Sequence, residues 1–186
     1  MKIVFLGTGE IGLPSLKAIH DSPDHDLISV FTQPDKPFGR KGELKPSEIK
    51  KFAQSKNIPI YQPEKIREQE AIDQLSLGNP DVLVVVAYGQ ILPEAVLRIP
   101  KIACINLHAS LLPLYRGASP IQAAILNGDE QTGLTSMYIA EGLDDGDLLK
   151  SKELIIDQDE TGGSLHDRLA ALGPELLIES LDLLSI

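Results

Sequence analysis

Cysteine and tryptophan are almost missing from this 186-residue chain, which has one cysteine, Cys104, and no tryptophan. A single cysteine cannot form an intramolecular disulfide, so we expect the fold to depend on an ordinary apolar core. No cluster of cysteine and histidine has metal-ligand spacing, and we expect no metal. Because its flanking residues are apolar, we interpret Cys104 as a small core residue rather than as a nucleophile.

Long apolar runs are missing as well. The longest, residues 82–87, is far shorter than the roughly 20 residues that a membrane-spanning helix needs. Residues 1–7 have neither the length nor the cleavage site of a signal peptide and are typical of a first β-strand. We therefore expect a cytoplasmic protein without a membrane partner, and we expect it to be a monomer.

Positive charge is scarce, because the net charge is −10. This excess of carboxylates argues against general binding of nucleic acids. The basic residues are unevenly distributed, however: residues 35–51 carry a net charge of +3 and the remaining residues carry −13. A local basic loop of this kind can still contact phosphates.

Short apolar segments alternate with amphipathic ones along the whole chain. The pattern predicts strands at 2–6, 27–32, 59–61, 81–87, 102–108, 134–140 and 148–156. Helices are expected at 14–20, 46–56, 64–77, 119–127 and 161–184, the last one kinked or split at Gly173-Pro174. Residues 33–46, with three prolines and two glycines, are expected to form a long loop. Together these elements predict an α/β fold with a doubly wound, mostly parallel, Rossmann-like sheet flanked by helices.

A glycine fingerprint, Gly7-Thr-Gly9-Glu-Ile-Gly12, follows the first strand and is typical of dinucleotide-binding proteins. The acidic residue that would hold the ribose is missing from the end of the second strand, which reads Phe31-Thr-Gln-Pro34. We therefore favour a tight structural turn. An NAD(P)-dependent oxidoreductase or dinucleotide-binding module stays open as an alternative from another class.

Asn106 and His108 lie two positions apart at the end of an expected strand. Side chains at this spacing leave the same face of a strand, about 6–7 Å apart. Open α/β sheets bind their ligands at the carboxyl ends of such strands. An amide donor beside an imidazole, with a carboxylate from the Gly142-Leu-Asp144 turn, suits acyl transfer.

Several motifs resemble one family over essentially the whole chain. The signature of folate-dependent formyltransferases is matched by Asn106-Leu-His108-Ala-Ser-Leu-Leu-Pro113, Tyr115-Arg-Gly117-Ala-Ser-Pro120-Ile-Gln122 and Gly142-Leu-Asp144-Asp-Gly-Asp147. The methionyl-tRNA formyltransferases are matched more specifically by Phe31-Thr-Gln-Pro-Asp35-Lys-Pro37-Phe-Gly-Arg40 and Val84-Val-Val-Ala-Tyr-Gly89-Gln-Ile-Leu-Pro93. The resemblance implies the formyltransferase fold, with residues 1–186 as the catalytic domain. The C-terminal β-barrel domain usual in the family is expected to be absent.

The resemblance also implies a reaction and its residues. The activity would be transfer of a formyl group from 10-formyltetrahydrofolate to the α-amine of methionine on initiator tRNA, for translation initiation. Asn106, His108 and Asp144 would be catalytic. The folate co-substrate would contact Ser110, Leu111, Leu112, Pro113, Gln90, Ile91 and Leu92. Initiator Met-tRNA would contact Arg40, Lys41 and Lys45. An N-formyltransferase acting on a nucleotide-linked amino sugar would share the donor and the chemistry, and remains an alternative.

Overall fold

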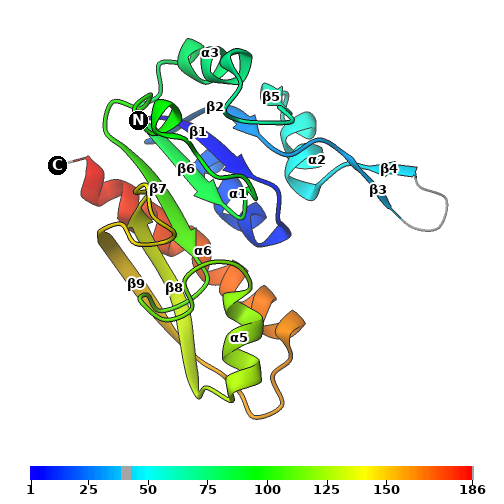
Figure 1. The fold of residues 1–186 in the computed structure, drawn as a ribbon, viewed down its shortest axis with the longest axis vertical. Coiled ribbons are helices and arrows are strands. Elements are labelled where there is room, and N and C mark those ends of the chain that lie inside the picture. Colours follow the sequence, from blue (N-terminus) through cyan, green and yellow to red (C-terminus); the bar gives the residue numbers. More distant parts are fainter. Residues whose placement is uncertain (39–42, 186) are drawn as a thin grey trace.

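A twisted β-sheet forms the centre of the molecule. The computed structural model describes residues 1–38 and 43–185, and within them seven strands follow the order β5-β2-β1-β6-β7-β8-β9 (Figure 1). The strands of this sheet are β1 (Lys2–Gly7), β2 (Asp26–Phe31), β5 (Ile60–Tyr61), β6 (Val82–Val86), β7 (Ala103–His108), β8 (Gln131–Tyr138) and β9 (Leu148–Ile155). The helices are η1 (Glu10–Gly12), α1 (Leu13–Asp21), α2 (Glu48–Ser55), α3 (Gln69–Leu77), α4 (Glu94–Leu97), α5 (Pro120–Asn127) and α6 (Gly162–Leu184). The predicted α/β fold with a mostly parallel sheet is confirmed.

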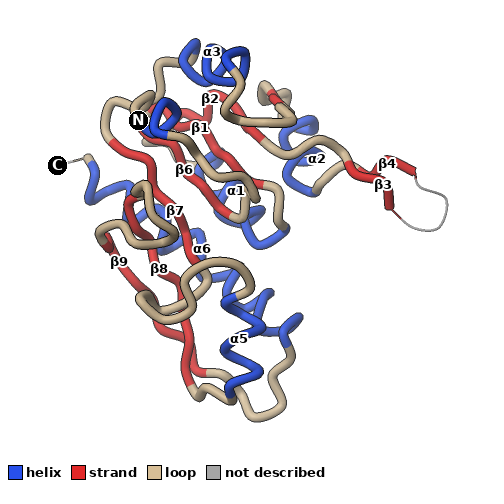
Figure 2. The backbone as a smooth tube through the Cα atoms, in the orientation of Figure 1, coloured by secondary structure: helices blue, strands red, loops and turns tan. Residues whose placement is uncertain are grey.

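Apolar side chains are buried on both faces of the sheet. One cluster joins the sheet to α1, α2, α5 and α6 and includes Leu16, Ile49 and Leu177. A second cluster joins the opposite face to α3 and α4 through Leu75 and Val96. Strand β6 is buried along its whole length, which explains its unbroken run of valine and leucine. The layered arrangement of strands and helices can be followed in Figure 2.

The order of the strands creates a crevice at one end of the sheet. The chain moves outward from β1 through β2 to β5, and then continues on the other side of β1 with β6 and β7. All neighbours from β5 to β7 are parallel, whereas β8 and β9 are antiparallel to the strands before them. Ligands of open α/β sheets bind where the strand order reverses, outside the carboxyl ends of the strands.

The expected loop at 33–46 contains a small hairpin. Strands β3 (Lys36–Phe38) and β4 (Glu43–Lys45) pair antiparallel and project from the body of the molecule (Figure 1). The base of the hairpin is held by Asp35, whose carboxylate lies 2.6 Å from the Lys50 ammonium and accepts a 2.9 Å hydrogen bond from Gln62. The sequence predicted a long loop here and missed the two short strands, because three-residue strands, one of them with Pro37, have no clear periodicity.

The sequence predicted a helix that is kinked or split at Gly173-Pro174; helix α6 is continuous through Pro174, so it is not split. Gly173 packs against α1, where an added Cβ would lie 2.5 Å from the Ser15 hydroxyl. Buried leucines on both sides of the proline, among them Leu169 and Leu176, hold the helix against the sheet. This tertiary packing outweighs the local cost of the proline. Among the described helices, none has the length and apolarity to cross a membrane.

Candidate active site

Strand β7 extends beyond its parallel neighbour and presents two polar side chains. Asn106 is paired with Val85 of β6 and with Met137 of β8, whereas His108 is paired with Thr135 of β8. Both side chains line one cavity. The His108 side chain is only 7% exposed, so its contacts with other polar groups matter for the chemistry of the ring.

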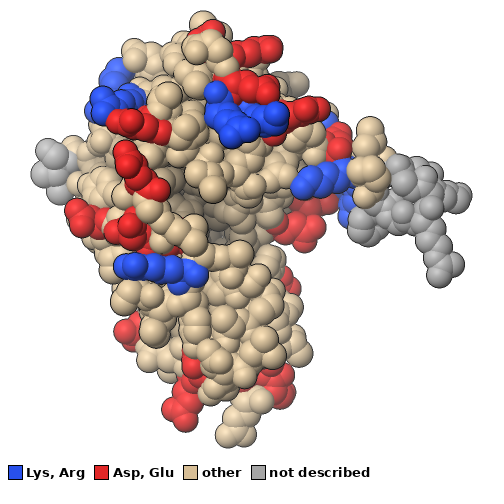
Figure 3. All heavy atoms as spheres, in the orientation of Figure 1, with Lys and Arg blue, Asp and Glu red and all other residues tan. Residues whose placement is uncertain are grey.

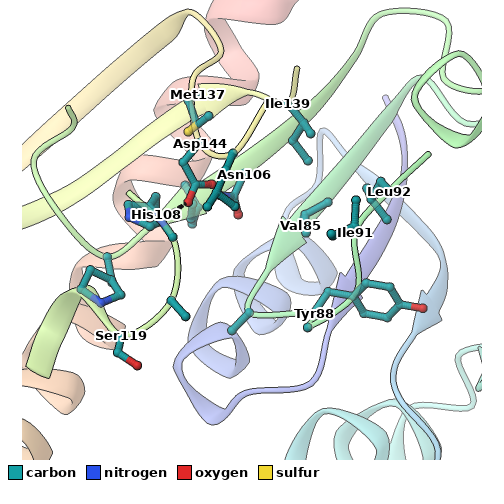
Figure 4. A pocket seen from close by; sticks show the side chains of 18 of the residues that line it. Val85, Tyr88, Ile91, Leu92, Asn106, His108, Ser119, Met137, Ile139 and Asp144 are labelled. Atoms are coloured by element: carbon teal, nitrogen blue, oxygen red, sulfur yellow. Dashed lines mark hydrogen bonds and ion pairs between the residues drawn. The ribbon is translucent and has the colours of Figure 1, made fainter. Parts of the chain in front are cut away.

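Asp144 approaches these two residues from the turn after β8. One oxygen of its carboxylate, Oδ2, lies 3.5 Å from the Nδ1 atom of His108 (Figure 4). The other, Oδ1, accepts a long hydrogen bond of 3.5 Å from the Asn106 amide. A shorter hydrogen bond of 2.8 Å comes from the backbone N–H of Gly117. Asp144 has a left-handed backbone with φ of 47°, which few non-glycine residues adopt and which often marks functional turns. The three side chains therefore converge, although their mutual contacts are at the long limit of hydrogen bonding.

The opposite side of the His108 ring faces a backbone carbonyl. The Nε2 atom lies 2.8 Å from the carbonyl oxygen of Tyr115. Because a carbonyl oxygen can only accept, we assign a hydrogen to Nε2. In the neutral ring, Nδ1 is then the nitrogen with a free lone pair, and it faces Asp144. The sequence carries no sign of this contact, since it involves a backbone atom.

The cavity around these residues has a volume of about 740 Å³. This is within the range of roughly 300–1,000 Å³ that is usual for small-molecule sites. Its walls are mainly apolar and come from β6 and the loop after it, from β7 and β8, and from the 139–144 turn. They include Val85, Leu92, Met137 and Ile139 (Figure 4). The cavity thus occupies the crevice that the strand order creates.

Gln90, Ile91 and Leu92, which the sequence placed near the folate, all line the cavity. The side chain of Gln90 is engaged elsewhere, because it accepts from the Ile66 backbone at 2.7 Å and donates to the Pro63 carbonyl. The Gln90 side chain therefore ties this loop to the segment 63–66. Ile91 is 88% exposed at this loop and Leu92 is buried.

Residues 110–113 form the turn that follows β7, and none of them is among the residues that line the cavity. Ser110 is fully buried and donates a 2.5 Å hydrogen bond to the carbonyl of Leu114. The backbone of Leu112 donates to Thr135, Leu111 is half-buried and Pro113 is exposed. In this structure the four residues shape the turn, and their contact with folate stays a prediction.

The expected tRNA-contacting residues are only partly described. Arg40 and Lys41 lie outside the described residues. Lys45 is exposed on β4, opposite Lys36 of β3. On the face drawn in Figure 3, lysine and arginine side chains gather in a few small groups, one of them beside this hairpin.

The glycine fingerprint is explained by close packing. The backbone N–H groups of Thr8 and Gly9 both donate to the Ala87 carbonyl at 3.2 Å. A Cβ added to Gly9 would lie 2.9 Å from the Cβ of Ala87, and one added to Gly12 would lie 3.2 Å from Val86. Because these two N–H groups already have a partner, they cannot also bind a pyrophosphate. The structure thus favours a packed turn over a dinucleotide site.

The strand order and the cavity, with polar side chains at its floor, define an α/β protein with a small-molecule site at the carboxyl ends of its strands. Residues 1–181 match the family described as formyl transferase, and the chain belongs to this family. It is 52% identical over 99% of its length to a methionyl-tRNA formyltransferase of Clostridioides difficile, and 52% identical over 97% to one of Pseudomonas fluorescens. The chain spans 59% and 57% of those relatives.

Solved structures agree on the fold. The phosphoribosylglycinamide formyltransferase of Bacillus halodurans superimposes with a TM-score of 0.81, at 20% identity, over 97% of this chain and 93% of that one. A formyltetrahydrofolate deformylase of Pseudomonas syringae superimposes with a TM-score of 0.76, at 22% identity, over 97% of this chain and 59% of that one. In the described part of the chain, no three His, Cys, Asp or Glu side chains are grouped so that they could hold a metal ion.

Proposed function

We propose that this chain transfers a formyl group from 10-formyltetrahydrofolate to the α-amine of methionine carried by initiator tRNA. The observation that carries the proposal is the convergence of Asn106, His108 and Asp144 on one cavity at the end of β7. The names of the relatives that are about 50% identical to this chain support the same reaction.

The apolar cavity suits the donor. Its volume of about 740 Å³ and its walls of aliphatic side chains can enclose a flat ring system. Residues 89–92 and 140–142 line the same space, and their backbone groups would pair with the polar edge of a pterin. The formyl group would then lie near Asn106, where the side chains of the floor meet.

The three polar residues would act on the formyl carbon. The amine attacks this carbon and its oxygen becomes negative, so the Asn106 amide and a protonated His108 would stabilise the oxyanion. The attacking amine must lose a proton, and Asp144 would accept it, directly or through a water molecule. When the bond between the carbon and the folate nitrogen breaks, that nitrogen takes up a proton, which His108 would supply. The products are tetrahydrofolate and methionyl-tRNA whose α-amine carries the formyl group as an amide.

The projecting hairpin would contact the tRNA. It lies within the basic segment 35–51, and the remainder of the chain is strongly acidic. An acidic body repels phosphates, whereas a basic projection attracts them and thereby orients the acceptor end. Arg40, Lys41 and Lys45 are the proposed contacts.

An assay that compares two acceptors tests this proposal. The protein is incubated with 10-formyltetrahydrofolate and either initiator Met-tRNA or a nucleotide-linked amino sugar, and the formylated products are measured. We expect formyl-methionyl-tRNA and no formylated sugar. Formylation of the sugar alone would reject the proposed acceptor while retaining the chemistry.

A further inference from the structure

Tyr115 holds the carbonyl that contacts the His108 ring, and the backbone at this residue is unusual. Its φ is 54°, in the left-handed region that costs a non-glycine residue roughly 1–2 kcal/mol. The carbonyl nevertheless lies 2.8 Å from His108 Nε2. A residue keeps such a conformation only when neighbouring contacts hold it.

Three hydrogen bonds around Tyr115 supply this support. The hydroxyl of Tyr115 donates a 2.5 Å hydrogen bond to the carboxylate of Asp129 and accepts one of 2.8 Å from the Asn127 amide. Asn127 is the last residue of α5, and the Asp129 backbone donates to the Ala124 carbonyl of the same helix. On the other side of Tyr115, Ser110 donates to the carbonyl of Leu114. The segment is therefore attached both to the sheet and to the end of α5.

The phenol is suited to this role. The bond from Asn127 lowers the pKa of Tyr115, but the bond to Asp129, desolvation of the phenol and the negative charge of Asp129 together raise it by more. The net pKa lies above the ordinary value, so the phenol keeps the proton that it donates to Asp129.

We propose that Tyr115 is a positioning residue: its phenol, anchored by Asn127 and Asp129 at the end of α5, holds its carbonyl against Nε2 of His108. The carbonyl keeps a hydrogen on Nε2 and so leaves Nδ1 as the nitrogen that exchanges a proton beside Asp144. The inference rests on the proposed function for its catalytic consequence, but the state of the ring can be observed without substrates.

The direct test is nuclear magnetic resonance of the full chain with ¹⁵N-labelled histidine. In the neutral form of the ring, we expect His108 of the wild type to carry its hydrogen on Nε2 alone. Tyr115→Phe keeps the ring and removes both anchoring bonds, and we expect a mixture of the two tautomers. The substitution Tyr61→Phe on β5 is the matched control, since its ring stacks on Phe31 away from the cavity, and it should leave the spectrum of His108 unchanged.

Activity gives the second readout. We expect Tyr115→Phe to lower kcat about tenfold, with KM for both substrates within about threefold of the wild type, because misplacement of a catalytic group affects the transition state most. Asp129→Ala should reproduce the loss. Asp129→Asn, which still offers an oxygen to the phenol, should restore most of the rate. Combining Tyr115→Phe with Asp129→Ala should cost no more than either alone, since both break one chain of contacts.

The outcomes separate the two proposals. If His108 of the wild type lacks the Nε2 hydrogen, or if Tyr115→Phe and Asp129→Ala leave both tautomer and kcat unchanged, the positioning role is overturned. If the tautomer shifts as expected while the wild type forms no formylated product, the positioning role stands and the proposed function fails. Should Tyr115→Phe fold poorly, Asp129→Ala carries the same test from outside the turn.

Discussion

The glycine turn after β1 offers a test of the packing account, because Gly9 has a backbone that any residue can adopt. Its φ and ψ are −70° and 145°, so conformational strain does not enter. Alanine at this position would bring its Cβ to 2.9 Å from the Cβ of Ala87, closer than two carbon atoms can approach. Overpacking of this kind lowers the free energy of unfolding by about 1–3 kcal/mol. Replacing glycine also reduces the conformational entropy of the unfolded chain, which raises the free energy of unfolding by about 0.4–1 kcal/mol. We expect Gly9→Ala to lower the free energy of unfolding by about 1–2 kcal/mol, and Tm by about 2–8 °C.

A second substitution isolates the contact. Ala87 has φ of 47°, so Ala87→Gly relieves backbone strain while it removes the opposing Cβ. It should be nearly neutral alone, and with Gly9→Ala it should restore the wild-type stability to within about 0.5 kcal/mol. Gly163→Ala in α6 is the control, since its added Cβ has no neighbour nearer than 3.8 Å and its Tm should not fall. Thermal unfolding of the four variants is the assay. The packing account is refuted if Gly9→Ala is as stable as the wild type, or if the double variant keeps the full penalty.

Three further predictions concern other parts of the chain. The hydrogen bond from Lys50, followed by that from Gln62, holds the pKa of Asp35 below its usual value, so Asp35 stabilises the fold above about pH 4 and this contribution is lost as pH falls further. Asp35→Asn should therefore unfold at lower urea than the wild type at neutral pH, with a difference that shrinks in acid; a constant difference would contradict this. Burial raises the pKa of the Cys104 thiol to about 12, so a thiol reagent at pH 8 should label the native protein far more slowly than the denatured one. Arg40→Glu should weaken binding of Met-tRNA and leave folate affinity nearly intact, and equal loss of both in binding assays would reject the proposed contact.

The strands of the sheet, and the placement of Asn106 and His108 on one face of a strand, could be predicted because they depend on local patterns. The unbroken apolar run at 82–86 identifies a strand covered on both faces, and the spacing of Asn106 and His108 puts both side chains on one face. The glycine turn was correctly interpreted from the missing carboxylate after β2. These features need only the period of a strand and the chemistry of its ends.

Contacts between distant segments could not be predicted from the pattern. Asp144 lies 38 residues from Asn106, so its approach depended on the assumed winding of the sheet and on the family resemblance, and the spacing along the chain could not give it. The contact of the Tyr115 carbonyl with His108 uses a backbone atom, which every residue has, so the side-chain sequence carries no sign of it. Pro174 predicts a break by its local preference, and only the packing of α6 against the sheet overrides that preference.

The central claim is that Asn106, His108 and Asp144 act together on one formyl carbon. The most direct measurement is the single-turnover rate of formyl transfer to Met-tRNA, with folate binding measured in parallel, for Asn106→Ala, His108→Ala and Asp144→Asn. We predict that each substitution lowers the rate by a factor on the order of 10² to 10³, while folate affinity changes only a few fold. A variant that keeps the full rate, or loses rate only because it no longer binds folate, would contradict the account.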